Sequence, residues 1–101
     1  MKEYKNESGK LHREDGPAIE RNNGSKEWYI NGKRHRTDGP AIEVSSGDKY
    51  WYINNKLHRE DGPAIEYYYG DKFWYLNGIQ YTQDKYQHEL VKIKLKRLVN
   101  L

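Results

Sequence analysis

Short β-type runs, in which aromatic and aliphatic residues alternate, return every 23 residues along this chain, and polar turns separate them. In the middle copy the run is Lys49–Ile53. Alternation with a period of two places Trp51 and Ile53 on one face of a strand, and Tyr50 and Tyr52 on the other face. The pattern therefore predicts a repeated strand with a Trp/Ile column on one face and a Tyr column on the other.

The polar segments between these runs carry turn signals. Asn31-Gly32 is typical of a tight hairpin turn, and Ser45–Asp48 of a second hairpin turn. In the longer segment between them, Gly39 permits a positive φ and Pro40 is expected to end the hydrogen-bond ladder. Two strands per unit predict an all-β meander of about six antiparallel strands. The repeat array covers residues 1–81, with units of about 9–31, 32–54 and 55–77.

The start of the chain is a polar lead-in with one aromatic residue, Tyr4. Tyr4 lies 23 residues before Glu27, in the column that holds Tyr50 and Phe73. This position predicts a truncated strand that caps the N-terminal side of the array. A frayed terminus is the alternative.

The end of the chain, segment 82–101, is expected to be an amphipathic helix that caps the array. Lys85 and Tyr86 stand where the earlier units have Gly-Pro. Without these two helix breakers, the chain can become helical from Gln83 to about Val99, with Thr82 as the N-cap. A stacked array of hairpins needs such a cap, because a single hairpin is only marginally stable in water.

The predicted helix has two apolar groups, about 140° apart at the roughly 100° step per residue of an α-helix. They are Tyr86, Leu90 and Ile93, and Val91, Leu95 and Leu98. The end of the sheet can cover one group, and the other is then left for a second chain. We therefore predict a homodimer through Val91, Leu95 and Leu98, with docking of a different partner on this group as the alternative.

The segment Tyr29–His35 reads Tyr-Ile-Asn-Gly-Lys-Arg-His and, with Gly47 at the next hairpin, resembles a MORN repeat. The likeness covers roughly residues 9–81. It departs after the histidine, where Arg-Xaa-Asp-Gly-Pro-Ala replaces the usual Gly-Xaa-Gly. That variant is similar to repeat proteins of bacteriophages and large DNA viruses and to antitoxin-like relatives.

This resemblance implies extended stacks of β-hairpins that bind proteins and sometimes lipid headgroups, although the changed turn weakens the lipid expectation. It also suggests a phage-type inhibitor that docks on a host protein, such as a host-defence or toxin component. For a viral protein the location would be the host cytoplasm. The absence of Cys, of a signal peptide and of a bilayer-length apolar run likewise favours a cytoplasmic protein.

Charge is distributed unevenly along the chain. The array holds 13 Lys and Arg against 13 Asp and Glu, whereas the tail holds five basic and two acidic residues. A nucleic-acid binder usually carries its basic surface on the main fold, so this balance makes nucleic acid the less favoured partner. Every candidate acid, base or nucleophile recurs in each unit, whereas enzyme sites are usually singular. We therefore expect no catalytic residues and no cofactor.

The phrase His-Arg-Xaa-Asp-Gly-Pro-Ala-Ile-Glu occurs three times. Equivalent histidines should lie two strands apart, on the order of 9–10 Å, and cannot share one zinc ion. We expect each His to anchor its turn by a hydrogen bond and each Arg to pair with the nearby Asp. The alternative is a nucleotide or nucleic-acid module in which these side chains bind phosphate. The residues concerned are His12, Arg13, His35, Arg36, His58 and Arg59.

Tyr67-Tyr68-Tyr69 breaks the repeat at a hairpin tip where the middle unit has Val44-Ser45-Ser46. A one-layer sheet cannot bury both faces, so we expect part of the aromatic surface to bind a protein partner. Packing of the three Tyr against the C-terminal helix is the alternative. The predicted partner-binding residues are Tyr67, Tyr68, Tyr69, Tyr50, Tyr52, Phe73 and Tyr75.

Overall fold

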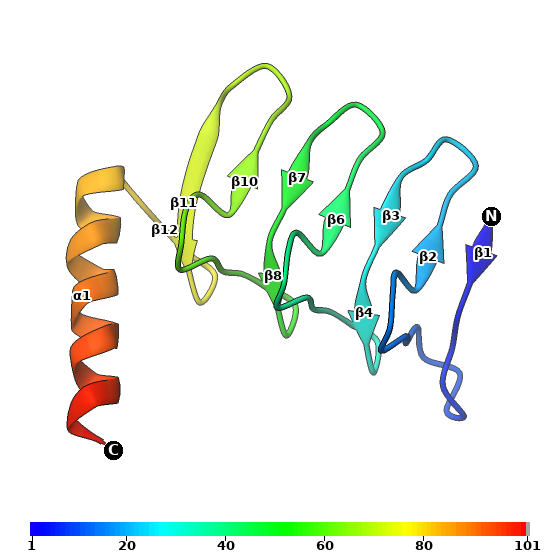
Figure 1. Cartoon of the computed structure of the whole chain (residues 1–101), viewed down its shortest axis with the longest axis horizontal. Coiled ribbons are helices and arrows are strands. Elements are labelled where there is room, and N and C mark those ends of the chain that lie inside the picture. The colour runs from blue at the N-terminus through cyan, green and yellow to red at the C-terminus, as the bar shows by residue number, and fades with distance from the viewer. Residues whose placement is uncertain (101) are drawn as a thin grey trace.

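The computed structural model describes residues 1–100 and contains twelve short strands and one helix (Figure 1). Eight strands form an antiparallel sheet in the order β1-β2-β3-β6-β7-β10-β11-β12. They are β1 (Lys2–Glu3), β2 (Ile19–Glu20), β3 (Lys26–Glu27), β6 (Ile42–Glu43), β7 (Lys49–Tyr50), β10 (Ile65–Glu66), β11 (Lys72–Leu76) and β12 (Ile79–Tyr81). Two separate hairpins pair β4 (Tyr29–Ile30) with β5 (Lys33–Arg34), and β8 (Tyr52–Ile53) with β9 (Lys56–Leu57).

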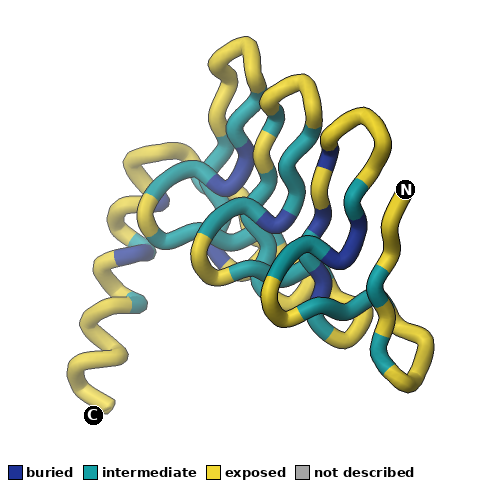
Figure 2. Tube along the Cα trace, turned by 45° about the vertical axis from the view of Figure 1, so that its right-hand side comes forward, coloured by how far each residue is buried: buried dark blue, intermediate teal, exposed yellow. Residues whose placement is uncertain are grey.

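The molecule is a thin row of hairpins with a helix, α1 (Gln83–Val99), at its C-terminal end (Figure 1). Its dimensions are 41 × 37 × 18 Å, and the short third dimension fits a single layer. Exposed residues dominate the hairpin turns, and buried residues lie between the turns (Figure 2). The predicted meander of antiparallel hairpins with a C-terminal helix is confirmed, but the strands are shorter and more numerous than predicted. Among residues 1–100, no helix has the length and apolar character that crossing a bilayer requires.

The predicted continuous strand Lys49–Ile53 is wrong, because the ladder breaks at Trp51. The Trp51 amide donates to the Ala64 carbonyl of the next unit at 2.8 Å. The Trp51 carbonyl instead accepts from the His58 amide at 3.0 Å, so the residue is shared between two pairings. Only the last copy, β11, runs unbroken, because β12 pairs with it through Trp74.

The tight turns have the predicted chemistry. Asn31 and Gly32 have φ values of 50° and 81°, which is the left-handed geometry of a type I′ hairpin turn. In the next unit Asn54 and Asn55, with φ values of 48° and 70°, replace the Asn-Gly pair. Asn tolerates this region better than other non-glycine residues, so the turn type is kept.

The buried core is small and repeats with the units. Ala18, Ala41 and Ala64 are fully buried, and the carbonyl of each accepts a hydrogen bond from the amide of a residue in the Trp column. A second cluster forms where the helix meets the last unit: Leu76, Tyr86 and Leu90 are all buried there. The helix therefore supplies the cover that a further repeat would give.

Helix α1 has the predicted bounds. The Thr82 side chain accepts a hydrogen bond from the Lys85 amide at 3.3 Å and thus caps the first turn as expected. The buried Tyr86 hydroxyl donates to the Arg59 carbonyl and fixes the helix against the third unit. The last residue of the predicted segment, Leu101, lies outside the described residues.

Tyr4 takes a different place from the predicted one. Its amide donates to Ala18 and its carbonyl accepts from His12, and Trp28 makes the same two backbone bonds in the next unit. The Arg13 guanidinium lies 4.1 Å from the Tyr4 ring centre, as an arginine lies over Trp28. Tyr4 therefore stands in the Trp column, because the turn that follows it is one residue longer than in later units.

Candidate functional site

The repeated turn is closed by its arginine. In the middle unit, Arg36 Nε donates to Asp38 Oδ1 at 2.9 Å, and Nη1 donates to the Pro40 carbonyl at 3.0 Å and to Glu43 Oε2 at 2.9 Å. The Arg36 Cζ lies 3.8 Å from the centre of the Trp28 ring. The hydrogen bond from Arg36 lowers the pKa of Asp38. We call this arrangement the arginine clasp; it confirms the predicted Arg–Asp pair.

The clasp explains the glycine of each turn. A Cβ added at Gly39 would lie 2.9 Å from Arg36 Cζ, and the same contact at Gly62 would be 2.9 Å from Arg59 Cζ. Neither glycine has a positive φ. The positive φ that glycine permits is therefore not used at Gly39, and glycine is needed because the guanidinium packs directly against it.

Each repeat histidine anchors the following tight turn. Its Nδ1 accepts a hydrogen bond from a backbone amide 19 residues later. The bonds are Asn31 to His12 at 2.9 Å, Asn54 to His35 at 3.1 Å and Asn77 to His58 at 2.9 Å. An accepting Nδ1 places the proton of the neutral ring on Nε2. The predicted anchoring role is confirmed, and among residues 1–100 no group of three or more His, Asp or Glu is placed to hold a metal ion.

The six candidate phosphate-binding residues thus have internal partners. In the third unit Arg59 binds Asp61 at 2.8 Å and Glu66 at 2.6 Å, and in the first unit Arg13 binds Asp15 at 3.1 Å. A phosphate at these turns would have to displace carboxylates from the guanidinium. Phosphate binding stays a prediction, and no contact in the described residues favours it.

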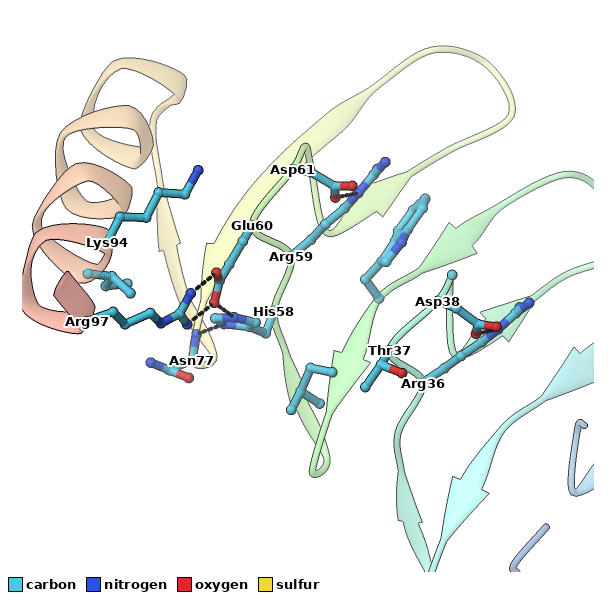
Figure 3. A pocket seen from close by; sticks show the side chains of 14 residues that line it. Arg36, Thr37, Asp38, His58, Arg59, Glu60, Asp61, Asn77, Lys94 and Arg97 are labelled. Atoms are coloured by element: carbon cyan, nitrogen blue, oxygen red, sulfur yellow. Dashed lines mark hydrogen bonds and ion pairs between the residues drawn. The ribbon is translucent and has the colours of Figure 1, made fainter. Parts of the chain in front are cut away.

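Two grooves lie between successive turns of the His-Arg-Xaa-Asp-Gly type. One has Trp28 and Ile30 in its lining and a volume of about 520 Å³. The equivalent groove in the next unit, with Trp51 and Ile53, has about 870 Å³, because helix α1 forms an extra wall through Arg97 (Figure 3). Trp and Ile therefore share one face, as predicted.

The helix wall is held by an ion pair that the sequence did not reveal. Arg97 Nη1 and Nη2 donate to Glu60 Oε1 and Oε2, both at 2.6 Å, and His58 Nε2 lies 2.8 Å from Glu60 Oε2 (Figure 3). The Arg97 hydrogen bonds, opposed by burial and helped by His58, lower the pKa of Glu60 to about 2. Glu60 occupies the variable position of the turn, so periodicity gave no reason to single it out.

The tip of the third hairpin brings five of the seven predicted partner-binding aromatics together. We call this group the aromatic tip: Tyr50, Tyr67, Tyr68, Tyr69 and Phe73. The Tyr67 ring lies 5.3 Å from Tyr69 in a parallel stack, and edge-on to Tyr50 at 6.1 Å and to Phe73 at 5.9 Å. Tyr68 is perpendicular to Tyr69 at 5.3 Å. Burial, followed by the hydrogen bond with Tyr67, raises the pKa of Tyr50 to about 12.

Tyr68 and Tyr69 are the exposed members of the aromatic tip, at 69% and 60%. Both ring neighbours of Tyr67 outside its own turn, Tyr50 and Phe73, belong to the sheet rather than to helix α1. Tyr67 therefore packs against rings of the sheet, whereas Tyr68 and Tyr69 are exposed to solvent.

The other two predicted aromatics lie elsewhere. The Tyr52 ring centre is 5.5 Å from the guanidinium carbon of Arg34, and the Tyr75 hydroxyl is 3.3 Å from Gln80 Oε1. Both residues lie beyond the Trp, in the half of the strand that leads to the tight turn. Most rings of the two aromatic columns are half-buried, and the more exposed rings are those of Tyr68 and Tyr69 at the tip.

Helix α1 divides its apolar residues as predicted. Tyr86, Leu90 and Ile93 pack against the last unit. The other group, Val91, Leu95 and Leu98, is exposed at 54%, 55% and 65%. This second group is therefore the other large apolar feature on the surface of the described residues.

Two acidic residues at the aromatic tip were also missed by sequence reasoning. Asp48 Oδ1 accepts a hydrogen bond from the Tyr68 amide at 2.8 Å, and Asp71 follows Gly70 at the same position of the next hairpin. The sequence did contain a sign of these two residues: the position after the hairpin glycine is Ser25 in the first unit and Asp in the two later units.

No family model, no curated protein and no solved structure matches this chain. The likeness to MORN-type repeats therefore rests on the motif itself. The function has to be argued from the clasps, the grooves, the aromatic tip and the outer face of the helix. Of these, the clasps recur in each unit, whereas the tip and the helix occur once.

Proposed function

We propose that this chain is a non-enzymatic binding protein that docks on another protein through its aromatic tip. The observation that carries the proposal is the exposure of Tyr68 and Tyr69 at a hairpin end where the middle unit has two serines. Exposed tyrosines are enriched at protein interfaces, because each ring buries a large area and retains a polar hydroxyl.

The support beneath these rings favours binding. Tyr67 stacks on Tyr69 and is itself packed edge-on against Tyr50 and Phe73. The hairpin backbone is also fixed, because Asp48 of the neighbouring hairpin accepts from the Tyr68 amide. A surface that is ordered before binding loses less conformational entropy when a partner arrives.

The resemblance to phage repeat proteins adds an expectation about the consequence of binding. We propose that docking blocks or holds the partner rather than modifying it, as a phage-type inhibitor of a host protein would. The turn residues that could serve chemistry are engaged in the arginine clasps of every unit. Residues that recur in this way usually serve the repeat.

The experiment has two stages. Affinity capture with the purified chain, followed by mass spectrometry, supplies candidate partners, and each is then tested as a purified binary pair. The decisive variant is Tyr68→Ser/Tyr69→Ser, which installs the residues of the middle unit. Because interface hot spots are each worth about 2 kcal/mol or more, we expect affinity to fall at least roughly 30-fold.

The matched control is Leu95→Ser/Leu98→Ser, which removes two exposed apolar side chains from the outer face of α1. Its affinity should equal that of the wild type. If the helix variant loses the partner and the tyrosine variant keeps it, the docking site is the helix and the proposal is wrong.

A further inference from the structure

Five aromatic rings elsewhere in the described part of the chain lie beside an arginine. Arg34 is shared between Tyr29 and Tyr52, at 5.7 and 5.5 Å from the two ring centres. Three other rings each have one arginine. These pairs are Arg13 with Tyr4 at 4.1 Å, Arg36 with Trp28 at 3.8 Å and Arg59 with Trp51 at 3.8 Å. In these pairs the guanidinium lies against the ring, and in the clasps it also binds carboxylates, so the groups satisfy one another within the array.

The aromatic tip has rings and carboxylates like those of a clasp, but it has no arginine or lysine that lies over its rings in the described residues. In the described part of the chain, no Arg or Lys lies over a ring of the tip, and Asp48 and Asp71 form no ion pair. Asp48 is half-buried and lies against the Tyr68 backbone, and Asp71 is exposed. Burial, then the charges of Asp71, Tyr67 and Asp48, raise the pKa of Tyr69, so both carboxylates act on this ring.

Two lysines, Lys49 and Lys72, directly follow the aspartates of the tip in the sequence. Lys49 stands opposite Glu43 on one neighbouring strand and opposite Glu66 on the other. Lys72 likewise stands opposite Glu66. Opposite charges directly across a strand pair attract one another, although Glu43 and Glu66 also pair with Arg36 and Arg59 of the clasps. Among residues 1–100 neither lysine forms an ion pair with Asp48 or Asp71, so these two carboxylates have no cationic partner in direct contact.

We propose that the aromatic tip binds a cationic side chain, arginine in preference to lysine, on the surface of the partner protein. The inference rests on the proposed function and specifies the chemistry of the partner. The cation would lie against the exposed ring faces of Tyr68 and Tyr69 and pair with Asp48 and Asp71. Arginine fits best because its planar guanidinium stacks on aromatic faces and binds carboxylates at the same time.

The test uses isotope-labelled protein and defined peptides, with binding followed by NMR at the ring resonances of Tyr68 and Tyr69. The probe is Ac-Gly-Arg-Gly-Arg-Gly-NH2. Its control replaces both arginines by citrulline, which keeps the shape and loses the charge. A third peptide carries leucine at both positions. We expect the arginine peptide to shift these resonances and to bind roughly fivefold or more tighter than the citrulline peptide, given the strength of a cation–π contact.

The matched variants change charge and keep shape. Asp48→Asn/Asp71→Asn should abolish most of the preference for arginine over citrulline, and the amide oxygen introduced at position 48 can still accept the hydrogen bond from the Tyr68 amide. Glu7→Gln, which removes an exposed charge from the first turn of the chain, should leave the preference unchanged. If the double variant fails to fold, as judged by its amide spectrum, Asp71→Asn alone provides the test, because Asp71 is exposed.

Three results would overturn the inference. One is equal binding of the arginine, citrulline and leucine peptides, which would assign the tip to an uncharged partner surface. The second is a response that lies outside the tip. The third is a concentration-dependent shift of the tip resonances without peptide, which would assign the tip to a second copy of this chain. None of these decides the proposed function, which stands or falls on the loss of the captured partner in the tyrosine variant.

Discussion

The arginine clasps and the aromatic tip both combine aromatic rings with carboxylates, but they differ in whether an arginine joins the two. On the turn side, Arg36 joins Trp28 to two carboxylates, so ring, cation and anion satisfy one another. At the tip of the third hairpin, Tyr68 and Tyr69 lie beside Asp48, and among residues 1–100 no Arg or Lys lies over either ring. The first arrangement recurs in every unit, and the second occurs once.

This difference separates structure from recognition. In a clasp the ring, the arginine and the carboxylates satisfy one another. The same residues therefore recur from unit to unit, because each copy stabilises its own turn. At the aromatic tip, the ring faces and the carboxylates remain available for contacts with a partner protein. In a repeat protein, the place where the repeat is broken is therefore the better guide to function than the residues that recur.

The largest expected effect comes from opening a clasp. Arg36→Ala removes the ring contact with Trp28, the bond to the Pro40 carbonyl and both carboxylate pairs. Because Glu43 then remains half-buried without its partner, we expect the free energy of unfolding to fall by about 2–3 kcal/mol. Urea denaturation measures the change. Tyr69→Ser, at an exposed ring, should change it by less than about 0.5 kcal/mol. Equal effects of the two variants would contradict the distinction between the two sides.

A smaller effect should come from crowding the clasp. Gly39→Ala places a Cβ at 2.9 Å from the Arg36 guanidinium carbon, and overpacking of this kind costs about 1–3 kcal/mol. The test is a double-mutant cycle with Arg36→Ala, measured by urea denaturation. In the arginine-free background Gly39→Ala should be nearly neutral. A cost that is the same in both backgrounds would show that the glycine serves the backbone and not the arginine.

Features governed by local rules were predictable from the sequence. The helix starts after Thr82 because a polar N-cap precedes a segment without the Gly-Pro breakers, and the structure has the same start. The tight turn at Asn31-Gly32 followed from the preference of Asn and Gly for positive φ. The split of the helix into a covered and an exposed apolar group followed from the helical period alone.

Features that depend on contacts between units were not predictable. The break at Trp51 arises because its amide and carbonyl bond to different segments. The need for glycine at residue 39 arises from a guanidinium packed against it. Tyr4 was assigned to the wrong column because a fixed step of 23 residues cannot register one extra turn residue. Asp48 was overlooked as a tip residue, because its contact with Tyr68 crosses from one hairpin to the next.

The pair that closes the large groove should give a modest pH dependence. Arg97 lowers the pKa of Glu60 to about 2 from an ordinary value of 4.5. A depressed carboxyl pKa contributes stability that is present above pH 4.5 and is lost as the pH falls towards 2. Since Arg97 is largely exposed, solvent screening limits this contribution to about 1 kcal/mol. Arg97→Gln should abolish that part of the acid sensitivity in urea denaturation, whereas Lys92→Gln on the outer side should not. Identical pH profiles for wild type and Arg97→Gln would contradict the role of the pair.

The smallest expected effect concerns the second open surface, the outer face of α1. Val91, Leu95 and Leu98 are exposed, and an antiparallel pair of helices would bury them twice. Lys92 and Lys94 flank this face at the helical step, so two copies repel one another as they approach. We therefore predict a weak homodimer, with a dissociation constant on the order of 100 μM, that tightens as salt screens the lysines. Sedimentation of the wild type at low and high salt, against Leu95→Glu/Leu98→Glu, measures it.

The salt response also separates the two open surfaces. An arginine peptide at the aromatic tip should bind more weakly as salt rises, because opposite charges are being screened there, whereas helix pairing should strengthen. A wild type that stays monomeric at several hundred micromolar in both salts would exclude self-pairing of this face. Docking of a different partner on this stripe would then be the remaining prediction, and its flanking lysines favour an acidic surface, opposite in charge preference to the tip.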